Sequence, residues 1–281
     1  MTARELLLLC WISYIDLPLL YISLIEKGGR IPLRALADYA LRRDLNGELE
    51  CVSLNSAARE AARELQKSTV DITGYINKND GDGFAAYIFD KDGMKIIAMR
   101  GSERAGLCVG SNIDWADNVC EPFAGSVQLE TISSLVSNYP AGEIIFTGHS
   151  KGGHNALLAL AVSENPDARA YAFNGQGFGA DALDDMQLMR LRDRGINYVV
   201  ADDMVGALLM HPEKRIYVRR NPGTNAHLPE AFMFDAAGMP VTARRTLKSQ
   251  LLEAASRIAD NRIDGTARRS VRDICRAALS R

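Results

Sequence analysis

An excess of charge of either sign is nearly absent from this chain. Its 33 Lys and Arg residues are balanced by 35 Asp and Glu residues, which leaves a net charge of −2 at pH 7 over 281 residues. Such a small charge creates no general field that would attract nucleic acid or an anionic membrane. The sequence therefore predicts no nucleic-acid partner, and it does not predict contact with a membrane surface.

Cysteine is scarce as well. The five cysteines are widely spaced, their number is odd, and no Cys-x-x-Cys motif occurs. This pattern argues against a disulfide framework and against a zinc cluster. We therefore expect a reducing, cytoplasmic location and no bound metal.

No long apolar run is free of charge or proline. Residues 6–25 are as long as a membrane span, but Asp16 and Pro18 lie in the middle. A charge near the centre of a bilayer costs roughly 3 kcal/mol. Glu5 and the lack of a small-residue cleavage site argue against a signal peptide. We expect one or two buried helices broken near Pro18, with a membrane anchor as the alternative.

Helical and strand patterns alternate through most of the chain. Strands are predicted at 84–90, 94–99, 143–147, 169–173, 196–201 and 214–219, and helices at 31–45, 54–67, 126–138, 152–163 and 181–194. The first two strands form a hairpin, and Ser126 is the expected N-cap of its helix. The alternation favours an α/β fold with a mostly parallel sheet covered by helices on both faces.

The C-terminal residues differ from the rest in composition. Residues 241–281 are helical in pattern and rich in Arg and Lys, with no aromatic residues among the charges. We expect residues 1–240 to form one domain that includes the N-terminal helices. Residues 241–281 are predicted to be a helical extension that docks on the sheet or on a partner subunit, with a nucleic-acid arm as the alternative.

The most informative stretch is the segment 147–153, Thr-Gly-His-Ser-Lys-Gly-Gly. It follows a β-branched run and precedes an Ala- and Leu-rich helical pattern, so Ser150 stands at a sharp turn between strand and helix. This is the pattern of a nucleophile elbow, in which Gly148 and Gly152 remove Cβ atoms where strand and helix nearly collide. The alternative is a glycine-rich turn with a capping serine.

A serine nucleophile needs an adjacent base, and the sequence has only four histidines. His227 is the favoured base because its loop follows the last predicted strand, where catalytic groups are often presented. His154, one helical turn after the serine, is the second candidate. His149 is expected to point away from Ser150, and His211 is expected in a surface loop.

The remaining parts of such a site also occur at strand ends. Asp202 and Asp203 follow the strand 196–201, and only one of them could orient the histidine, because adjacent side chains point in different directions. An oxyanion hole needs two donors. The amide of Lys151 is one candidate, and the amide and hydroxyl of Ser102 are the other.

Together these motifs resemble the class 3 lipases, the fungal type of α/β-hydrolase, and most of all a bacterial branch that carries Gly-His-Ser-Lys-Gly-Gly. The segments that carry the resemblance are 96–102, 114–118, 147–153, 203–206 and 227–232. The resemblance implies an α/β-hydrolase fold and a triad of Ser150, Asp203 and His227, with Asp203 favoured over Asp202. It also implies an oxyanion hole at Ser102 and Lys151, and an ester or lipid substrate cleaved without a metal or cofactor.

Two departures from the fungal pattern stand out. Residues 103–113 are short and contain two glycines where the fungal enzymes carry a helical lid, so opening of a lid is not expected. Lys151 follows the serine where the fungal enzymes usually carry a leucine.

Two other functions share these motifs: transfer of the acyl group to an acceptor other than water, and an inactive scaffold that kept the elbow.

The favoured base leads to a first prediction. An imidazole accepts the serine proton only when it is neutral, so the rate of ester hydrolysis should fall below about pH 6 to 7. A pH–rate profile with a short-chain p-nitrophenyl ester measures this directly. A rate that stays flat across this range would exclude His227 as the base.

Overall fold

The computed structural model describes residues 1–45, 56–78, 81–102 and 126–261. The motif at 114–118, the segment 103–113 and the end of the predicted extension, from residue 262, lie outside the described residues. Everything below concerns the described part of the chain.

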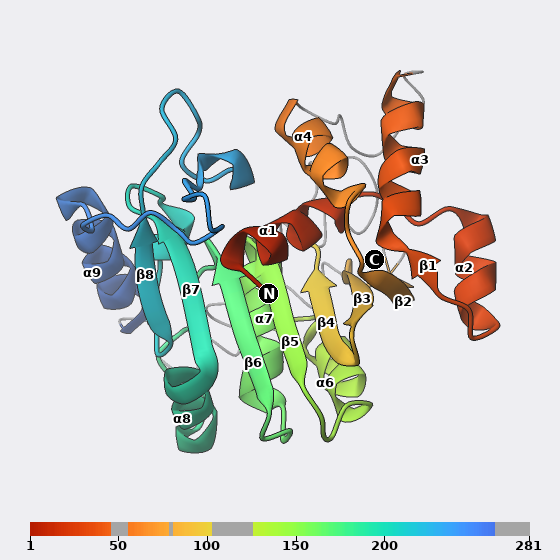
Figure 1. Ribbon diagram of the computed structural model, residues 1–281. Helices are drawn as coiled ribbons and strands as arrows, with labels where there is room; N and C mark the ends of the chain where they lie inside the picture. Colours follow the sequence, from red (N-terminus) through yellow and green to blue (C-terminus); the bar gives the residue numbers. More distant parts are fainter. Residues whose placement is uncertain (46–55, 79–80, 103–125, 262–281) are drawn as a thin grey trace.

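A sheet of eight strands organises the described residues (Figure 1). In spatial order, which is also chain order, they are β1 (Ile31–Pro32), β2 (Asp71–Asn77), β3 (Ala85–Lys91), β4 (Met94–Met99), β5 (Ile144–His149), β6 (Ala168–Phe173), β7 (Gly195–Val200) and β8 (Lys214–Val218). Neighbours from β4 to β8 are parallel, and β1 to β4 are antiparallel. The predicted mostly parallel sheet is confirmed, but its antiparallel part is larger than a single hairpin.

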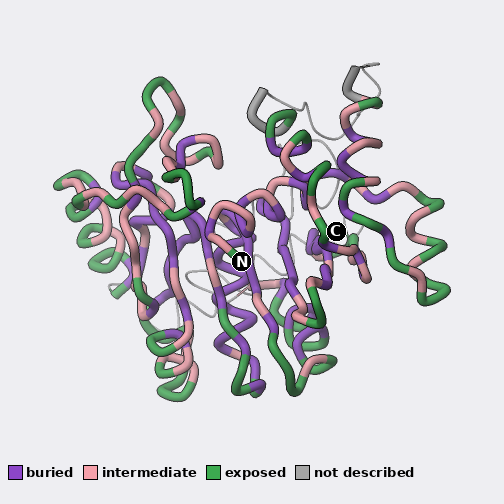
Figure 2. Tube along the Cα trace, in the orientation of Figure 1, coloured by how far each residue is buried: buried purple, intermediate pink, exposed green. Residues whose placement is uncertain are grey.

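Helices cover both faces of this sheet. They are α1 (Ala3–Ile12), α2 (Leu19–Glu26), α3 (Leu33–Leu45), α4 (Ser56–Leu65), α6 (Leu129–Ser137), α7 (Lys151–Val162), α8 (Asp185–Arg194) and α9 (Leu247–Asn261). Helix α1 crosses one face, while α6, α7 and α8 lie on the other (Figure 1). Each face has its own apolar core, and the strands between them are buried along most of their length (Figure 2). With the serine turn between β5 and α7, this is an α/β-hydrolase architecture.

Two helices begin later than the sequence pattern predicted. Ser126 does not cap α6: its hydroxyl accepts a hydrogen bond from the amide of Gln128, and the helix starts at Leu129. Helix α8 starts at Asp185, because Asp184 forms a capping box with Gln187. In both cases a polar side chain bonds locally to the backbone and so sets the boundary.

The N-terminal apolar stretch forms two helices with different environments. Helix α1 buries Leu6, Leu9 and Ile12, as expected. Helix α2 does not: none of its residues is buried, and Leu19 is 82% exposed, so the expectation of burial is wrong there. Among the described residues, no helix combines the length and the apolar character that crossing a membrane requires.

The segment between these helices is fixed to the sheet by polar contacts. Arg100 donates from Nε to the carbonyl of Ser13 (2.6 Å) and from Nη2 to Oδ1 of Asp16 (2.8 Å). The hydroxyl of Tyr87 donates to the carbonyl of Ile15 (2.6 Å). Asp16 therefore breaks the apolar run because it pairs with the arginine at the end of β4. These contacts hold the segment against the strand end that leads into Ser102.

The hydrogen bond from Arg100 to the carbonyl of Ser13 leads to a second prediction. The side chain of Arg100 is 2% exposed, so Arg100→Met should lower the free energy of unfolding by about 2 to 3 kcal/mol, because it leaves the Ser13 carbonyl without a donor. Arg30→Met is the matched control, since Arg30 is 58% exposed and its ion pairs should contribute less than about 1 kcal/mol. Urea unfolding measures both, and equal losses would contradict the assignment.

Candidate functional site

The turn at Ser150 has the strained backbone of a nucleophile elbow. Ser150 lies between the last residue of β5 and the first residue of α7, with φ 58° and ψ −124°. Its amide donates to the carbonyl of Phe173 at the end of β6 (2.9 Å). A positive φ is costly for a serine and persists only where the surrounding structure enforces it. The turn therefore presents the serine side chain beyond the carboxyl ends of the central strands.

The glycines on either side make this turn sterically feasible. A Cβ atom on Gly148 would lie 2.1 Å from the carbonyl oxygen of Gly152. A Cβ atom on Gly152 would lie 2.2 Å from the carbonyl oxygen of Met99. Both distances are far below van der Waals contact, and the obstructing atoms are backbone atoms that cannot swing aside. No other residue fits at either position, as the motif predicted.

Three side chains meet beside this turn. Nε2 of His227 lies 2.9 Å from Oγ of Ser150, and Nδ1 lies 3.0 Å from Oδ1 of Asp203. A carboxylate only accepts hydrogen bonds, so it favours the tautomer with the proton on Nδ1. Nε2 is then free to accept the serine hydroxyl. The three residues chosen from the sequence thus lie in hydrogen-bond contact in the order that a triad requires, while their catalytic roles remain a prediction.

The two adjacent aspartates face different partners. Asp203 is 1% exposed, and its Oδ2 accepts a hydrogen bond from the amide of Gly206 (2.6 Å), which fixes the carboxylate toward His227. Asp202 turns to the surface and pairs with Arg220 (3.0 Å). The short 3₁₀ helix Val205–Ala207 supplies the amide that orients Asp203. The geometry therefore offers a carboxylate to the histidine from Asp203 and not from Asp202.

The predicted oxyanion donors lie at the carboxyl ends of neighbouring strands. Lys151 is the first residue of α7, where the backbone amides and the helix dipole favour negative charge. Ser102 follows the end of β4, which pairs in parallel with β5. Gly101, the residue before Ser102, is close to the elbow: a Cβ atom there would lie 2.5 Å from the carbonyl oxygen of His149. Their function as an oxyanion hole remains a prediction.

Two other histidines are buried away from this cluster. Nδ1 of His154 lies 3.2 Å from the carbonyl oxygen of Gln176, so His154 is not placed to act as the base. The expected surface position of His211 is wrong, because its side chain and that of Glu213 are fully buried and 2.7 Å apart. Burial alone would raise the pKa of Glu213, but the charge and hydrogen bond of His211 hold it below its usual value. The hydrogen bond to Glu213, two residues further along the chain, holds the side chain of His211 in the interior.

His149 contacts the candidate base, which its position in the sequence does not indicate. Its side chain does not contact the serine, but its ring lies 5.1 Å from the ring of His227, between ring centroids. Nε2 of His149 lies 2.6 Å from the carbonyl oxygen of His227. Asn174, which was not singled out, also donates to this carbonyl from Nδ2 (3.1 Å). An unusual φ of 50° at Asn174 is visible only in the structure.

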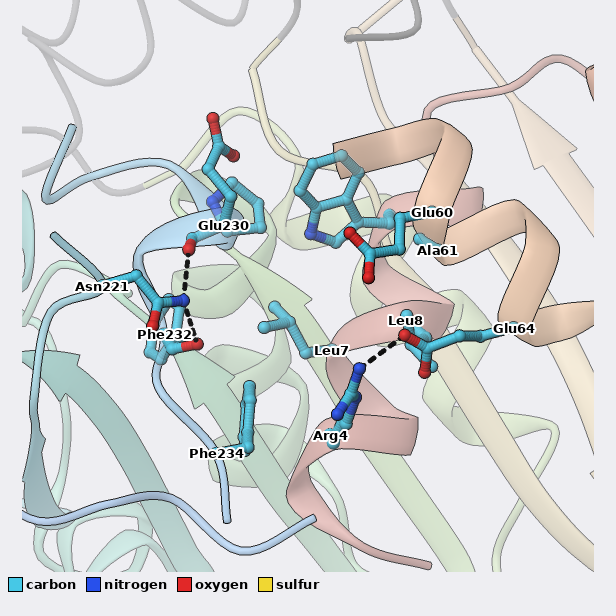
Figure 3. A pocket seen from close by; sticks show the side chains of 12 residues that line it. Arg4, Leu7, Leu8, Glu60, Ala61, Glu64, Asn221, Glu230, Phe232 and Phe234 are labelled. Carbon is cyan, nitrogen blue, oxygen red and sulfur yellow. Dashed lines mark hydrogen bonds and ion pairs between the residues drawn. The ribbon is translucent and has the colours of Figure 1, made fainter. Parts of the chain in front are cut away.

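A hollow of about 260 Å³ borders the segment that carries His227 (Figure 3). One wall comes from α1 and α4, where Arg4 faces Glu64, and the other comes from Asn221 and from residues within 229–234. The side-chain amide of Asn221 donates to the carbonyls of Glu230 (2.9 Å) and Phe232 (3.2 Å) and closes the base of the loop. Within the described ranges, no group of three or more His, Cys, Asp or Glu side chains is arranged to hold a metal ion.

The elbow generates a third prediction. Gly152→Ala should lower the free energy of unfolding by roughly 3 kcal/mol or more, because the new methyl group collides with the backbone of β4. Gly81→Ala is the control, since a Cβ atom there would have its nearest neighbour at 3.5 Å, an ordinary contact. Urea unfolding of both variants measures the difference. Similar midpoints would show that the elbow tolerates a side chain.

Comparisons with known proteins give one matching family and several similar solved structures. No curated protein matches the chain. Similar solved structures include Lip2 lipase from Yarrowia lipolytica, with 13% identity, 92% of this chain and 91% of that chain covered, and a TM-score of 0.44. They also include a mono- and diacylglycerol lipase from Aspergillus oryzae, with 15% identity, 85% and 93% covered, and a TM-score of 0.42. The model of the Mbeg1-like family matches residues 61–274, well over half of the sequence, and the chain belongs to this family.

Proposed function

We propose that this protein is a serine hydrolase that cleaves carboxylic esters through an acyl-enzyme on Ser150. The observation that carries the proposal is the continuous contact from Ser150 through His227 to Asp203, at 2.9 and 3.0 Å. These distances lie within the range needed for proton transfer between a nucleophile and its base. The elbow supports the proposal because it presents the serine on a rigid turn.

Acylation begins at the serine hydroxyl. Nε2 of His227 takes the hydroxyl proton as Oγ attacks the ester carbonyl, and the carboxylate of Asp203 stabilises the imidazolium that forms. The amides of Lys151 and Ser102 hold the negative oxygen of the tetrahedral intermediate. The intermediate collapses, the bond to the alcohol oxygen breaks, and the imidazolium gives its proton to the departing alcohol.

Deacylation repeats these steps with water. His227 takes a proton from the water molecule, which attacks the acyl carbon, and the acid leaves as the proton returns to Oγ of Ser150. The carboxylate of Asp203, whose other oxygen is fixed by the amide of Gly206, keeps a proton on Nδ1 of His227, so only Nε2 gains and loses a proton. We propose a small ester or lipid as the substrate and the cytoplasm as the place of action.

We also propose that residues 1–240 form one domain and that residues 241–281 form a helical extension of it.

A fourth prediction compares the two adjacent aspartates. Asp203→Asn should lower kcat for p-nitrophenyl butyrate by about 10⁴-fold, because the amide favours the wrong tautomer of His227. Asp202→Asn should keep activity within about 2-fold, since Asp202 pairs with Arg220 at the surface. Steady-state kinetics at the pH of maximal rate measures both variants. Equal losses would refute the assignment of the acid.

Ser150→Ala completes the test of the proposed reaction. It should abolish hydrolysis and labelling by a fluorophosphonate while the unfolding temperature changes little, because the serine hydroxyl supports chemistry rather than packing. Hydrolysis at the wild-type rate in this variant would refute the acyl-enzyme on Ser150. Esters of increasing acyl length, tested on the wild-type protein, then define the preferred substrate.

A further inference from the structure

The backbone carbonyl of His227, like its ring, takes part in two hydrogen bonds. Its carbonyl oxygen accepts hydrogen bonds from Nε2 of His149 (2.6 Å) and from Nδ2 of Asn174 (3.1 Å). The same Nδ2 also lies 3.0 Å from the carbonyl oxygen of Ala226. We call His149 and Asn174 the carbonyl clamp. Neither clamp residue belongs to the relay of Ser150, His227 and Asp203.

The clamp residues lie at the carboxyl ends of β5 and β6, next to the strand ends that carry the relay. His149 is the last residue of β5 and directly precedes Ser150. Asn174 directly follows β6, and its Oδ1 accepts a hydrogen bond from the amide of Val200 (2.9 Å), the last residue of β7. Asp203 lies three residues beyond Val200. The clamp therefore connects the loop of His227 to the same strand ends that position the serine and the aspartate.

The loop of His227 has little regular structure of its own. Between β8 and α9 the described residues contain one short 3₁₀ helix, Pro229–Ala231, and isolated bridges. Asn221 closes the base of the loop through the carbonyls of Glu230 and Phe232. His227 lies between these two ends, and its side chain is 28% exposed. Contacts from the sheet are therefore needed to fix the position of its backbone.

His149 is suited to donate this hydrogen bond at every working pH. A carbonyl only accepts, so Nε2 of His149 must carry the proton. Burial and the neighbouring ring of His227 lower the pKa of His149 to about 3, which keeps the ring neutral. Nδ1 is then unprotonated, and it has no hydrogen-bond partner among the described residues. The ring of His149 therefore serves as a fixed donor and not as a second base.

We propose that His149 and Asn174 are positioning residues that hold the backbone of His227 so that its ring spans Ser150 and Asp203. This inference rests on the proposed function, because the position of the ring matters only if His227 transfers protons. A displacement of about 1 Å at a reacting group can cost on the order of 100-fold in rate. Loss of the clamp should therefore lower kcat and leave KM nearly unchanged.

The first experiment separates the donor of His149 from its volume. His149→Phe keeps an aromatic ring of similar size without the donor, and kcat for p-nitrophenyl butyrate should fall by about 10- to 100-fold. His149→Gln places an amide N–H near the position of Nε2 and should restore activity to within about 3-fold of wild type. His154→Phe is the matched control, since His154 is equally buried and bonds to the carbonyl of Gln176, outside the loop.

Asn174→Asp tests the clamp without removing the side chain. Aspartate tolerates the positive φ of this position and keeps an acceptor for the Val200 amide, but it cannot donate to the carbonyl of His227 when ionised. A 10- to 100-fold lower kcat with little change in KM is expected on the alkaline plateau of the rate. This variant keeps the test decisive if His149→Phe does not fold.

The outcomes separate the clamp from the proposed function. If the wild-type protein is labelled on Ser150 by a fluorophosphonate but Asn174→Asp and His149→Phe react at wild-type rates, the clamp is refuted and the hydrolase remains. Equal losses in His149→Phe and His149→Gln, or equal losses in His149→Phe and His154→Phe, would also refute it. Hydrolysis that persists in Ser150→Ala would refute the proposed function instead.

Discussion

The hydrogen bond between Ser150 and His227 joins two residues that are 77 positions apart in the chain. It exists only because the carboxyl ends of parallel strands meet at one edge of the sheet. The serine turn follows β5, the aspartate follows β7 and the histidine loop follows β8. The geometry of the candidate site is thus a consequence of strand order, and local sequence contributes the final orientation of each side chain.

Close contacts with backbone atoms set the final orientation of Ser150 and Asp203. Gly148 and Gly152 let the start of α7 approach β4 and β5 closely enough to strain Ser150 into its turn. The amide of Gly206 turns Asp203 inward, while Asp202 remains at the surface with its own arginine. The turn at Ser150 and the orientation of Asp203 are therefore each set by neighbouring backbone atoms. Strain and buried polar groups persist because the surrounding structure satisfies them.

Local patterns were predicted well from the sequence. The elbow, the hairpin between β3 and β4 and the alternation that builds the parallel sheet are each encoded in contiguous residues. Strands β1 and β2 were missed, since β1 has two residues and the pairing of β2 shifts at Gly74. Helix α2 was expected to be buried, yet none of its residues is, and Leu19, Leu20 and Leu24 are exposed, because composition alone does not say which face a helix presents.

Residues whose role depends on long-range contacts were harder to predict. Spacing alone left Asp202 and Asp203 equivalent, and the choice between them depends on an amide three residues further on. His211 precedes Pro212, a pattern typical of a surface loop, and nothing in that pattern reveals its buried contact with Glu213. The sequence pattern predicts only that His149 points away from Ser150, because its contact with the backbone of His227 joins residues 78 positions apart.

The proposed hydrolysis depends on one step, the transfer of the acyl group to Ser150 during turnover. Rapid acid quenching of the wild-type protein with p-nitrophenyl butyrate, followed by peptide mass spectrometry, measures the site of acylation directly. We expect a burst of p-nitrophenol and a butyryl group on the peptide that contains Ser150. Turnover with no acylated peptide under any quench time, or with the acyl group on another residue, would contradict it.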